Sequence, residues 1–104
     1  MAQYDVFSNP SSSAADGIPY VVVIQSDLLD ALATRLTMPL AELDIAVKVP
    51  IALCPVIVVN GQRLHALAHY VAPLPARLLK RPVDNVSAQA SALVSAMDAV
   101  LSGL

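Results

Sequence analysis

Two histidines are the first residues in this chain whose spacing could do chemistry. His65 and His69 are four residues apart, which on a helix places both side chains on one face and suits a shared metal ion. On a strand the same spacing separates them by about 13 Å, too far for two ligands of one zinc ion at about 2.0–2.1 Å. The segment follows Asn60-Gly61 and is expected to be a strand, and no pair of Cys or Glu accompanies it. We therefore expect ordinary, half-exposed histidines and no metal or cofactor.

Candidate nucleophiles and acid–base pairs are equally isolated. Cys54 lies in an apolar stretch without a basic neighbour in sequence, so we expect a small buried hydrophobic residue. Asp27 and Asp30 are three residues apart, and we expect a helix cap and a solvated carboxylate. No nucleophile elbow surrounds the serines, and three dispersed glycines make no phosphate loop. These residues do not predict an enzyme.

Two other features are better suited to binding. Leu28 and Leu29 lie between two aspartates, where they are either plugs of the core or part of a contact patch. The chain ends on Leu101-Ser102-Gly103-Leu104 without a polar tail. This ending is either a frayed helix terminus or a projection into a partner.

The composition predicts that the chain associates with something. Of 104 residues, 57% are hydrophobic and 13% charged, too few charges to cover the surface that a chain of this size leaves exposed. A spanning helix needs about 20 apolar residues in a row, whereas the longest run here, Val49–Val59, is interrupted by Pro50 and Pro55. We expect no membrane insertion, and a second protein surface to cover the excess.

Net charge and cysteine content bear on which partners the protein binds and in which compartment it is found. The net charge is −2 and the six Lys and Arg residues are spread along the chain, which disfavours direct nucleic-acid binding. The single cysteine suits a reducing compartment, and the N-terminus has no secretory pattern. We expect a cytoplasmic protein.

The first half of the chain reads as short strands. Strands are expected at Tyr4–Phe7 and at Pro19–Gln25, the second buried on both faces, joined as a hairpin by a long loop rich in turn residues. Ser26–Ala33 either opens a helix capped by Ser26 or Asp27 or is an irregular loop. Arg35–Leu40 is a further strand, and Pro39 assigns it to a sheet edge or a strand end.

The second half adds a hairpin and a helix. Val56–Val59 and Gln62–Ala68 are strands joined by Asn60-Gly61, a dipeptide typical of type I′ turns. Pro73, Pro75 and Pro82 exclude a long element, although Arg77–Leu79 could pair as an edge strand.

After Pro82 the apolar residues recur at spacings of three and four, which predicts a helix packed on both sides. Its stripe is Val86, Ala90, Leu93, Met97, Val100 or Leu101, and Leu104. Asp84, Asn85 or Ser87 caps its start, and Gly103 marks its end. The predicted plan is one domain over residues 1–104, mainly β, with five to seven strands and a C-terminal helix.

Several of these segments resemble one known family. Val23–Asp30 (VIQSDLLD), Arg35–Leu40 (RLTMPL) and Leu53–Gly61 (LCPVIVVNG) resemble CcdB, the toxin of bacterial plasmid-addiction modules, in order and spacing. Pro75 and the C-terminal helix that ends in Gly-Leu extend the resemblance over essentially the whole chain, with looser matches at Ser8–Gly17 and Glu42–Ala52.

The resemblance implies an SH3-like β-barrel with a C-terminal α-helix, assembled as a homodimer with Met97 near the dimer interface. It also implies a toxin that is not an enzyme, binds the A subunit of DNA gyrase and traps the enzyme with its DNA cleaved. A CcdA-type antitoxin neutralises such toxins and joins them in a repressor complex. The gyrase-facing positions of the family correspond here to Leu28, Leu29, Asp98, Ser102, Gly103 and Leu104.

Two of these positions depart from the family pattern, which has Trp at the position of Ser102 and Asn at that of Asp98. A tryptophan can form an interface hot spot and stack on a guanidinium group, which a serine cannot do. The alternatives are therefore a CcdB-like protein with weakened or lost gyrase poisoning, kept for antitoxin binding and autoregulation, or an endoribonuclease of the MazF or Kid type.

Overall fold

A computed structural model describes residues 1–44 and 51–103 of the chain. In this part the strands are β1 (Asp5–Ser8), β2 (Tyr20–Val23), β3 (Thr34–Glu42), β4 (Val56–Val59), β5 (Gln62–Ala66), β6 (Ala72–Pro75) and β7 (Asp84–Asn85), and the α-helix is α1 (Ala90–Ser102). Short 3₁₀ turns connect them: η1 (Ser12–Asp16), η2 (Asp27–Leu29), η3 (Ile51–Leu53), η4 (Ala68–Tyr70), η5 (Ala76–Leu78) and η6 (Ser87–Gln89). The chain is mainly β with one C-terminal helix, as the sequence predicted.

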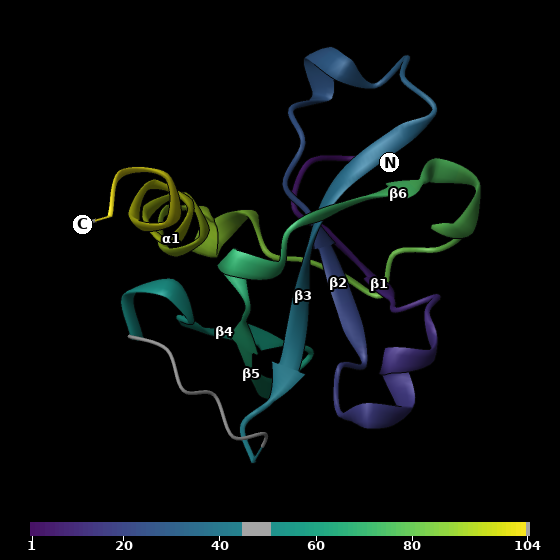
Figure 1. Cartoon of the computed structure of the whole chain (residues 1–104). Helices are drawn as coiled ribbons and strands as arrows, with labels where there is room; N and C mark the ends of the chain where they lie inside the picture. Colours follow the sequence, from purple (N-terminus) through teal and green to yellow (C-terminus); the bar gives the residue numbers. More distant parts are fainter. Residues whose placement is uncertain (45–50, 104) are drawn as a thin grey trace.

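The strands form one antiparallel sheet in the order β4-β5-β3-β2-β1-β7, with β6 also on β3. β3 runs through the middle of the molecule (Figure 1) and has nine residues, more than any other strand described. One of its edges pairs with β2, while the other is shared between β6 along its first half and β5 along its second half. A strand shared in this way belongs to both halves of the sheet, which curves into a nearly closed barrel.

Side chains close most of the remaining gap between β4 and β7. The Gln89 amide accepts from the Val58 N–H and donates to the Val58 carbonyl, both at 2.8 Å, and so replaces one rung of a strand ladder. The Asn60 N–H donates to the Asp84 carboxylate at 3.0 Å, and the Asn60 amide donates to the Val83 carbonyl at 2.9 Å. The two ends of the sheet are thus joined without strand pairing.

The interior of the barrel is aliphatic. β1, β2 and β3 contribute residues to one buried cluster with β4, β5 and α1, and the helix seals it with Leu93 and Ala96. Its largest buried members are Val6, Val22, Met38, Leu40, Ile57, Val59, Leu64 and Leu93. These are the β-branched runs and the helix stripe that the sequence predicted as core.

The local turn chemistry is confirmed. Asn60 and Gly61 both have positive φ, 48° and 83°, as a type I′ turn requires, and they join β4 to β5. Gly103 has a φ of 75° and its N–H donates to the Ala99 carbonyl, which ends α1 where the sequence predicted. The predicted cap of the helix by Asp84, Asn85 or Ser87 is wrong, because the N-cap of α1 is Gln89 and makes no side-chain cap bond. The Asn85 carboxamide instead accepts from the Ser87 N–H at 2.9 Å before η6.

The prediction that Pro39 marks an edge or a strand end is wrong. Pro39 lies inside the central strand β3, opposite Val21. Its carbonyl accepts from the Leu67 N–H at 2.9 Å, so the missing N–H of the proline faces the same edge. Along this edge of β3, pairing with β6 ends at Thr37 and pairing with β5 starts at Leu40. The proline thus falls in the gap between two partners, where β3 needs no donor.

The edge strand predicted at Arg77–Leu79 is also wrong, because Ala76–Leu78 forms η5 and the strand lies just before it, at β6. β6 contains Pro73 and Pro75, whose missing N–H groups fall on one edge because they are two residues apart. β6 pairs with β3 alone among the described strands, so one edge needs no donors.

The buried face of α1 differs from the predicted stripe. Leu93, Ala96 and Ala99 are buried, whereas Val100 and Leu101 are exposed. The small Ala96 and Ala99 let the helix approach the barrel closely, and Val94 and Leu101 point away. Val100 follows Ala96 on the same face but lies near the end of the helix, where it stays exposed. In the single chain described here, one side of the helix is therefore not packed.

Candidate functional site

Leu28 stands out from the surface on a well-ordered turn. The Ser26 hydroxyl accepts from the Leu28 N–H at 3.2 Å and caps η2, as the sequence predicted for one of its two alternatives. The Leu28 side chain is 94% exposed and Leu29 is 49% exposed. The prediction that this pair plugs the core is wrong, because the turn exposes both side chains.

A buried arginine fixes the loop that carries this turn. The Arg35 guanidinium donates to the Asp30 carbonyl at 2.6 Å and the Thr34 carbonyl at 2.9 Å, and also to the Leu32 carbonyl. It forms an ion pair with the Asp30 carboxylate at 3.0 Å. Sequence reasoning missed this role, because an arginine at the start of a strand is an ordinary surface residue until its burial is known.

Gln25 holds the same loop from its other end. Its amide nitrogen donates to the Leu29 and Thr34 carbonyls at 3.3 and 3.2 Å, and its amide oxygen accepts from the Leu36 N–H at 2.9 Å. The Asp27 carboxylate accepts from the Gln3 N–H at 2.7 Å. The exposed Leu28 therefore stands on a loop whose backbone is held on both sides.

The predicted residues at the end of α1 gather along one side of the helix. Met97 and Asp98 line a hollow of about 160 Å³ together with Ile24, Gln3 and Val94. Because the Gln3 amide also donates to the Ile24 carbonyl at 3.1 Å, the N-terminal segment links this hollow to the strand that leads into the Leu28 turn. In Figure 1 the helix lies to the left of the sheet and the η2 turn at the top.

Ser102 and Gly103 are exposed at the last turn of α1, and Leu104 lies outside the described residues. The Ser102 hydroxyl donates to the Asp98 carbonyl at 2.6 Å. The side chain that replaces the family tryptophan is thus turned back onto its own helix and satisfies a carbonyl there.

The outer side of α1 is an exposed apolar strip interrupted by one carboxylate. Val94, Asp98 and Leu101 follow at spacings of four and three and so share a face, whereas Val100 lies on the side of Leu93 and Ala96. Val94 is 49% and Leu101 79% exposed. This strip has the composition of a surface that another protein covers.

Cys54 and the two histidines meet in space although they are separated in sequence. The Cys54 thiol lies 4.0 Å from Nδ1 of His69, and the Cys54 carbonyl lies 3.0 Å from Nδ1 of His65. Burial raises the pKa of the Cys54 thiol, which favours the neutral form over a nucleophilic thiolate. His65 lies on β5 and His69 on η4, beyond the strand predicted at Gln62–Ala68, which ends two residues earlier at Ala66. Among residues 1–44 and 51–103, no three His, Cys, Asp or Glu side chains gather as a metal site would require.

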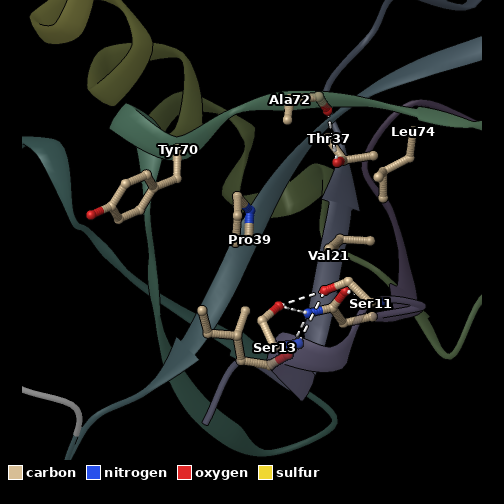
Figure 2. Close-up of a pocket in the computed structure, with 10 residues that line it drawn as sticks. Ser11, Ser13, Val21, Thr37, Pro39, Tyr70, Ala72 and Leu74 are labelled. Carbon is tan, nitrogen blue, oxygen red and sulfur yellow. Dashed lines mark hydrogen bonds between the residues drawn. The ribbon is translucent and has the colours of Figure 1, made fainter. Parts of the chain in front are cut away.

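A larger hollow of about 440 Å³ was not predicted from the sequence (Figure 2). Its floor is the outer face of β2 and β3, where Val21, Thr37 and Pro39 lie, and β6 adds Ala72 and Leu74. Ser11, Ser13 and Asn9 form a hydrogen-bonded group at one side, and Tyr70 stands at another. The hollow arises because the Ser8–Gly17 loop and β6 rise on either side of the sheet, a long-range arrangement without a local sequence signal.

Within the described part of the chain, no helix has the length and apolar character needed to cross a membrane. Comparison with curated proteins gave no match. Comparison with family models matches residues 3–103 to the family described as CcdB protein. This match spans the barrel, the Leu28 turn and the helix described above, and the chain therefore belongs to the CcdB family of toxins from toxin–antitoxin systems.

Proposed function

We propose that this toxin acts by binding another protein rather than by catalysis, and that its target is the A subunit of DNA gyrase, which it traps with the DNA cleaved. The observation that carries the proposal is Leu28, an apolar side chain 94% exposed on a turn held by Ser26, Gln25 and Arg35. Covering such a side chain gains about 1.5–3 kcal/mol, and a rigid loop loses little entropy on binding.

A second copy of the chain is proposed to cover the outer strip of α1, with Met97 near the interface. The strip is apolar at Val94 and Leu101, and Met97 lies half-buried beside it in the hollow with Asp98. A homodimer would place two Leu28 turns on one particle, as suits a target with two A subunits. A CcdA-type antitoxin is the proposed neutralising partner, and the bacterial cytoplasm is the proposed location, where gyrase is found.

A second candidate function is favoured by Ser102. Its hydroxyl is engaged with the Asp98 carbonyl, so no large side chain projects from the last turn of α1. A toxin without that anchor would still bind its antitoxin and support autoregulation while poisoning gyrase weakly or not at all. The ribonuclease alternative has less support, because binding an RNA backbone calls for more positive charge than a chain of net charge −2 carries.

A gyrase cleavage assay with purified proteins tests both candidates. The toxin is incubated with gyrase, ATP and supercoiled DNA, and linear DNA is measured after denaturation of the protein. We expect linear DNA with the natural chain, a decrease of about tenfold with Leu28→Ala, and no change with Leu32→Ala, an exposed leucine of the same loop. We expect Ser102→Trp to increase cleavage.

Three outcomes separate the candidates. No cleavage by the natural chain but cleavage by Ser102→Trp, together with tight antitoxin binding by both, supports the second candidate. Growth arrest in bacteria with intact gyrase activity, for both chains, contradicts gyrase as the target. Degradation of RNA by the purified dimer would make the protein an enzyme.

A further inference from the structure

Half of the basic residues lie within one five-residue segment, which corrects the expectation that they are spread along the chain. Arg77, Lys80 and Arg81 follow one another around η5, in a protein of net charge −2. All three are exposed. In the part of the chain that the structure describes, the ion pair present is Arg35–Asp30, so none of these three cations is paired with a carboxylate.

Two of these cations stand at the rim of a hollow of about 320 Å³. Lys80 and Arg81 line it together with Phe7, Ser8, Leu78 and Val83. Phe7 is buried and forms the floor, while Leu78 and Val83 are each more than a third exposed. The hollow therefore combines an apolar floor with a positively charged rim, and it fits an apolar side chain flanked by carboxylates.

The hollow also borders an open strand edge. The Val6 carbonyl of β1 accepts from the Val83 N–H at 2.8 Å, so the main-chain groups of Val6 face β7. Two residues later, those of Ser8 face the same edge, because alternate residues of a strand point the same way. The Asn9 N–H instead donates to Pro19, on the β2 side, as this alternation requires. Beyond the end of β7, Ser8 has no strand partner on that edge among the described residues.

We propose that this hollow, bounded by Phe7, Ser8, Leu78, Lys80, Arg81 and Val83, binds an extended acidic segment of a partner protein. Carboxylates of the segment pair with Lys80 and Arg81, an apolar side chain covers Phe7, and main-chain groups pair with Ser8 as an added strand. Such strand addition draws affinity from the backbone and specificity from the side chains.

Charge and surface chemistry favour a peptide over a nucleic acid. A nucleic-acid site combines a longer basic track with exposed aromatic rings for base stacking, whereas Phe7 is 2% exposed and three cations lie here. The surface is also separate from the proposed gyrase-binding residues. In Figure 1, η5 lies to the right of the sheet, α1 to its left and the Leu28 turn at the top. The proposal therefore stands whether or not the protein binds gyrase.

Fluorescence anisotropy with synthetic peptides tests the proposal on the whole 104-residue chain. One labelled twelve-residue peptide alternates Glu or Asp with Leu or Val, and the other has Gln or Asn in place of each acid. At low salt we expect the acidic peptide to bind at least about tenfold more tightly, and the difference to shrink at high salt because surface charges are screened.

Matched variants assign the binding to this surface. Lys80→Gln combined with Arg81→Gln is expected to weaken the acidic peptide about tenfold, and Val83→Ser to weaken both peptides equally. Arg63→Gln removes a cation from β5, away from the hollow, and is expected to leave binding unchanged. Circular dichroism of each variant verifies that the barrel is folded.

Three results would overturn the proposal. Equal binding of acidic and neutral peptides removes the role of charge. If Arg63→Gln weakens binding of the acidic peptide as much as the Lys80 and Arg81 variant does, the effect is one of net charge and not of this hollow. Tighter binding of a single-stranded oligonucleotide of the same charge, lost in the Lys80 and Arg81 variant, would make the surface a nucleic-acid site instead.

Discussion

Arg35 combines two properties that rarely occur together, burial and a charge that serves backbone carbonyls. Its guanidinium satisfies carbonyls of Asp30, Leu32 and Thr34, all in the loop that carries Leu28. Arginine suits this role because its planar group presents several donors in fixed directions. Arg35 therefore fixes the backbone of the loop that exposes Leu28.

Replacing Arg35 with methionine is predicted to destabilise the fold by about 2–3 kcal/mol, because hydrogen bonds to a charged group are lost and the carbonyls keep no protein partner. Asp30 is half-exposed and regains water, which limits the loss. Urea unfolding measures the change. Arg77→Met, at an exposed and unpaired cation, is the control and should change stability by less than about 0.5 kcal/mol. A similar small change for Arg35→Met would contradict the role assigned to the guanidinium.

Cys54 makes a contribution to the stability of the fold that is lost at alkaline pH. The ordinary thiol pKa is 9.0, and burial raises the pKa of Cys54 in the folded chain. The unfolded chain therefore loses this proton first, so the contribution is complete below pH 9 and is lost as the pH rises through the folded pKa.

The measurement is the difference in unfolding free energy between the natural chain and Cys54→Ala, from pH 7 to pH 10. We expect the natural chain to lose its advantage above pH 9, while tyrosines and lysines, common to both chains, cancel. A difference that does not change with pH would mean that the thiol titrates alike in the folded and unfolded chains.

At the scale of the element, the sequence predicts those features that neighbouring residues determine. Asn60-Gly61 encodes its turn because both residues accept positive φ, and Gly103 ends α1 for the same reason. Pro39 misleads, because what makes it acceptable is a gap between β5 and β6 that depends on residues 25 or more positions away. Likewise the burial of Ala96 and Ala99 in place of the predicted Met97 depends on how closely the helix approaches the barrel.

The Gln89 amide takes the place of a neighbouring strand by bonding the main chain of β4, and its removal should make β4 less stable. Gln89→Ala is predicted to cost about 1–2 kcal/mol, because both main-chain groups of Val58 lose their partner. Amide hydrogen exchange should become faster at Val58, which the amide now protects. Ser91→Ala, at an exposed position of α1, is the matched control. Unaltered exchange at Val58 in the Gln89 variant would show that solvent or another strand replaces the amide.

At the scale of the whole molecule, the excess of hydrophobic residues is explained only in part by the barrel. The β-branched strands are buried as expected, but Leu28 and the outer strip of α1 remain exposed in the single chain. The composition predicted that a partner covers apolar surface. It could not assign this surface to one side of α1, because that assignment depends on which residues the barrel already covers.

The strip on α1 makes a direct prediction about assembly. Val94→Asp combined with Leu101→Asp should convert a dimer to a monomer of 10.9 kDa, because four added carboxylates cannot be buried without partners. Sedimentation equilibrium measures the mass. Ser12→Asp combined with Ala15→Asp adds the same charge at exposed positions of η1, outside the helix, and should leave the dimer intact. A dimer that survives the first pair of substitutions must use a different surface.

The way in which the sheet is closed also has a consequence for protein synthesis. β1 pairs with β7, and the contacts between β4 and the last part of the barrel come from Val83, Asp84 and Gln89. While the ribosome still encloses the residues after Pro82, the nascent chain has an open sheet and no helix to cover its core. The closed end of the barrel and the exposed strip of α1 therefore form only after β7 and α1 have left the ribosome. The Leu28 turn needs neither, because Gln25, Ser26 and Arg35 hold it.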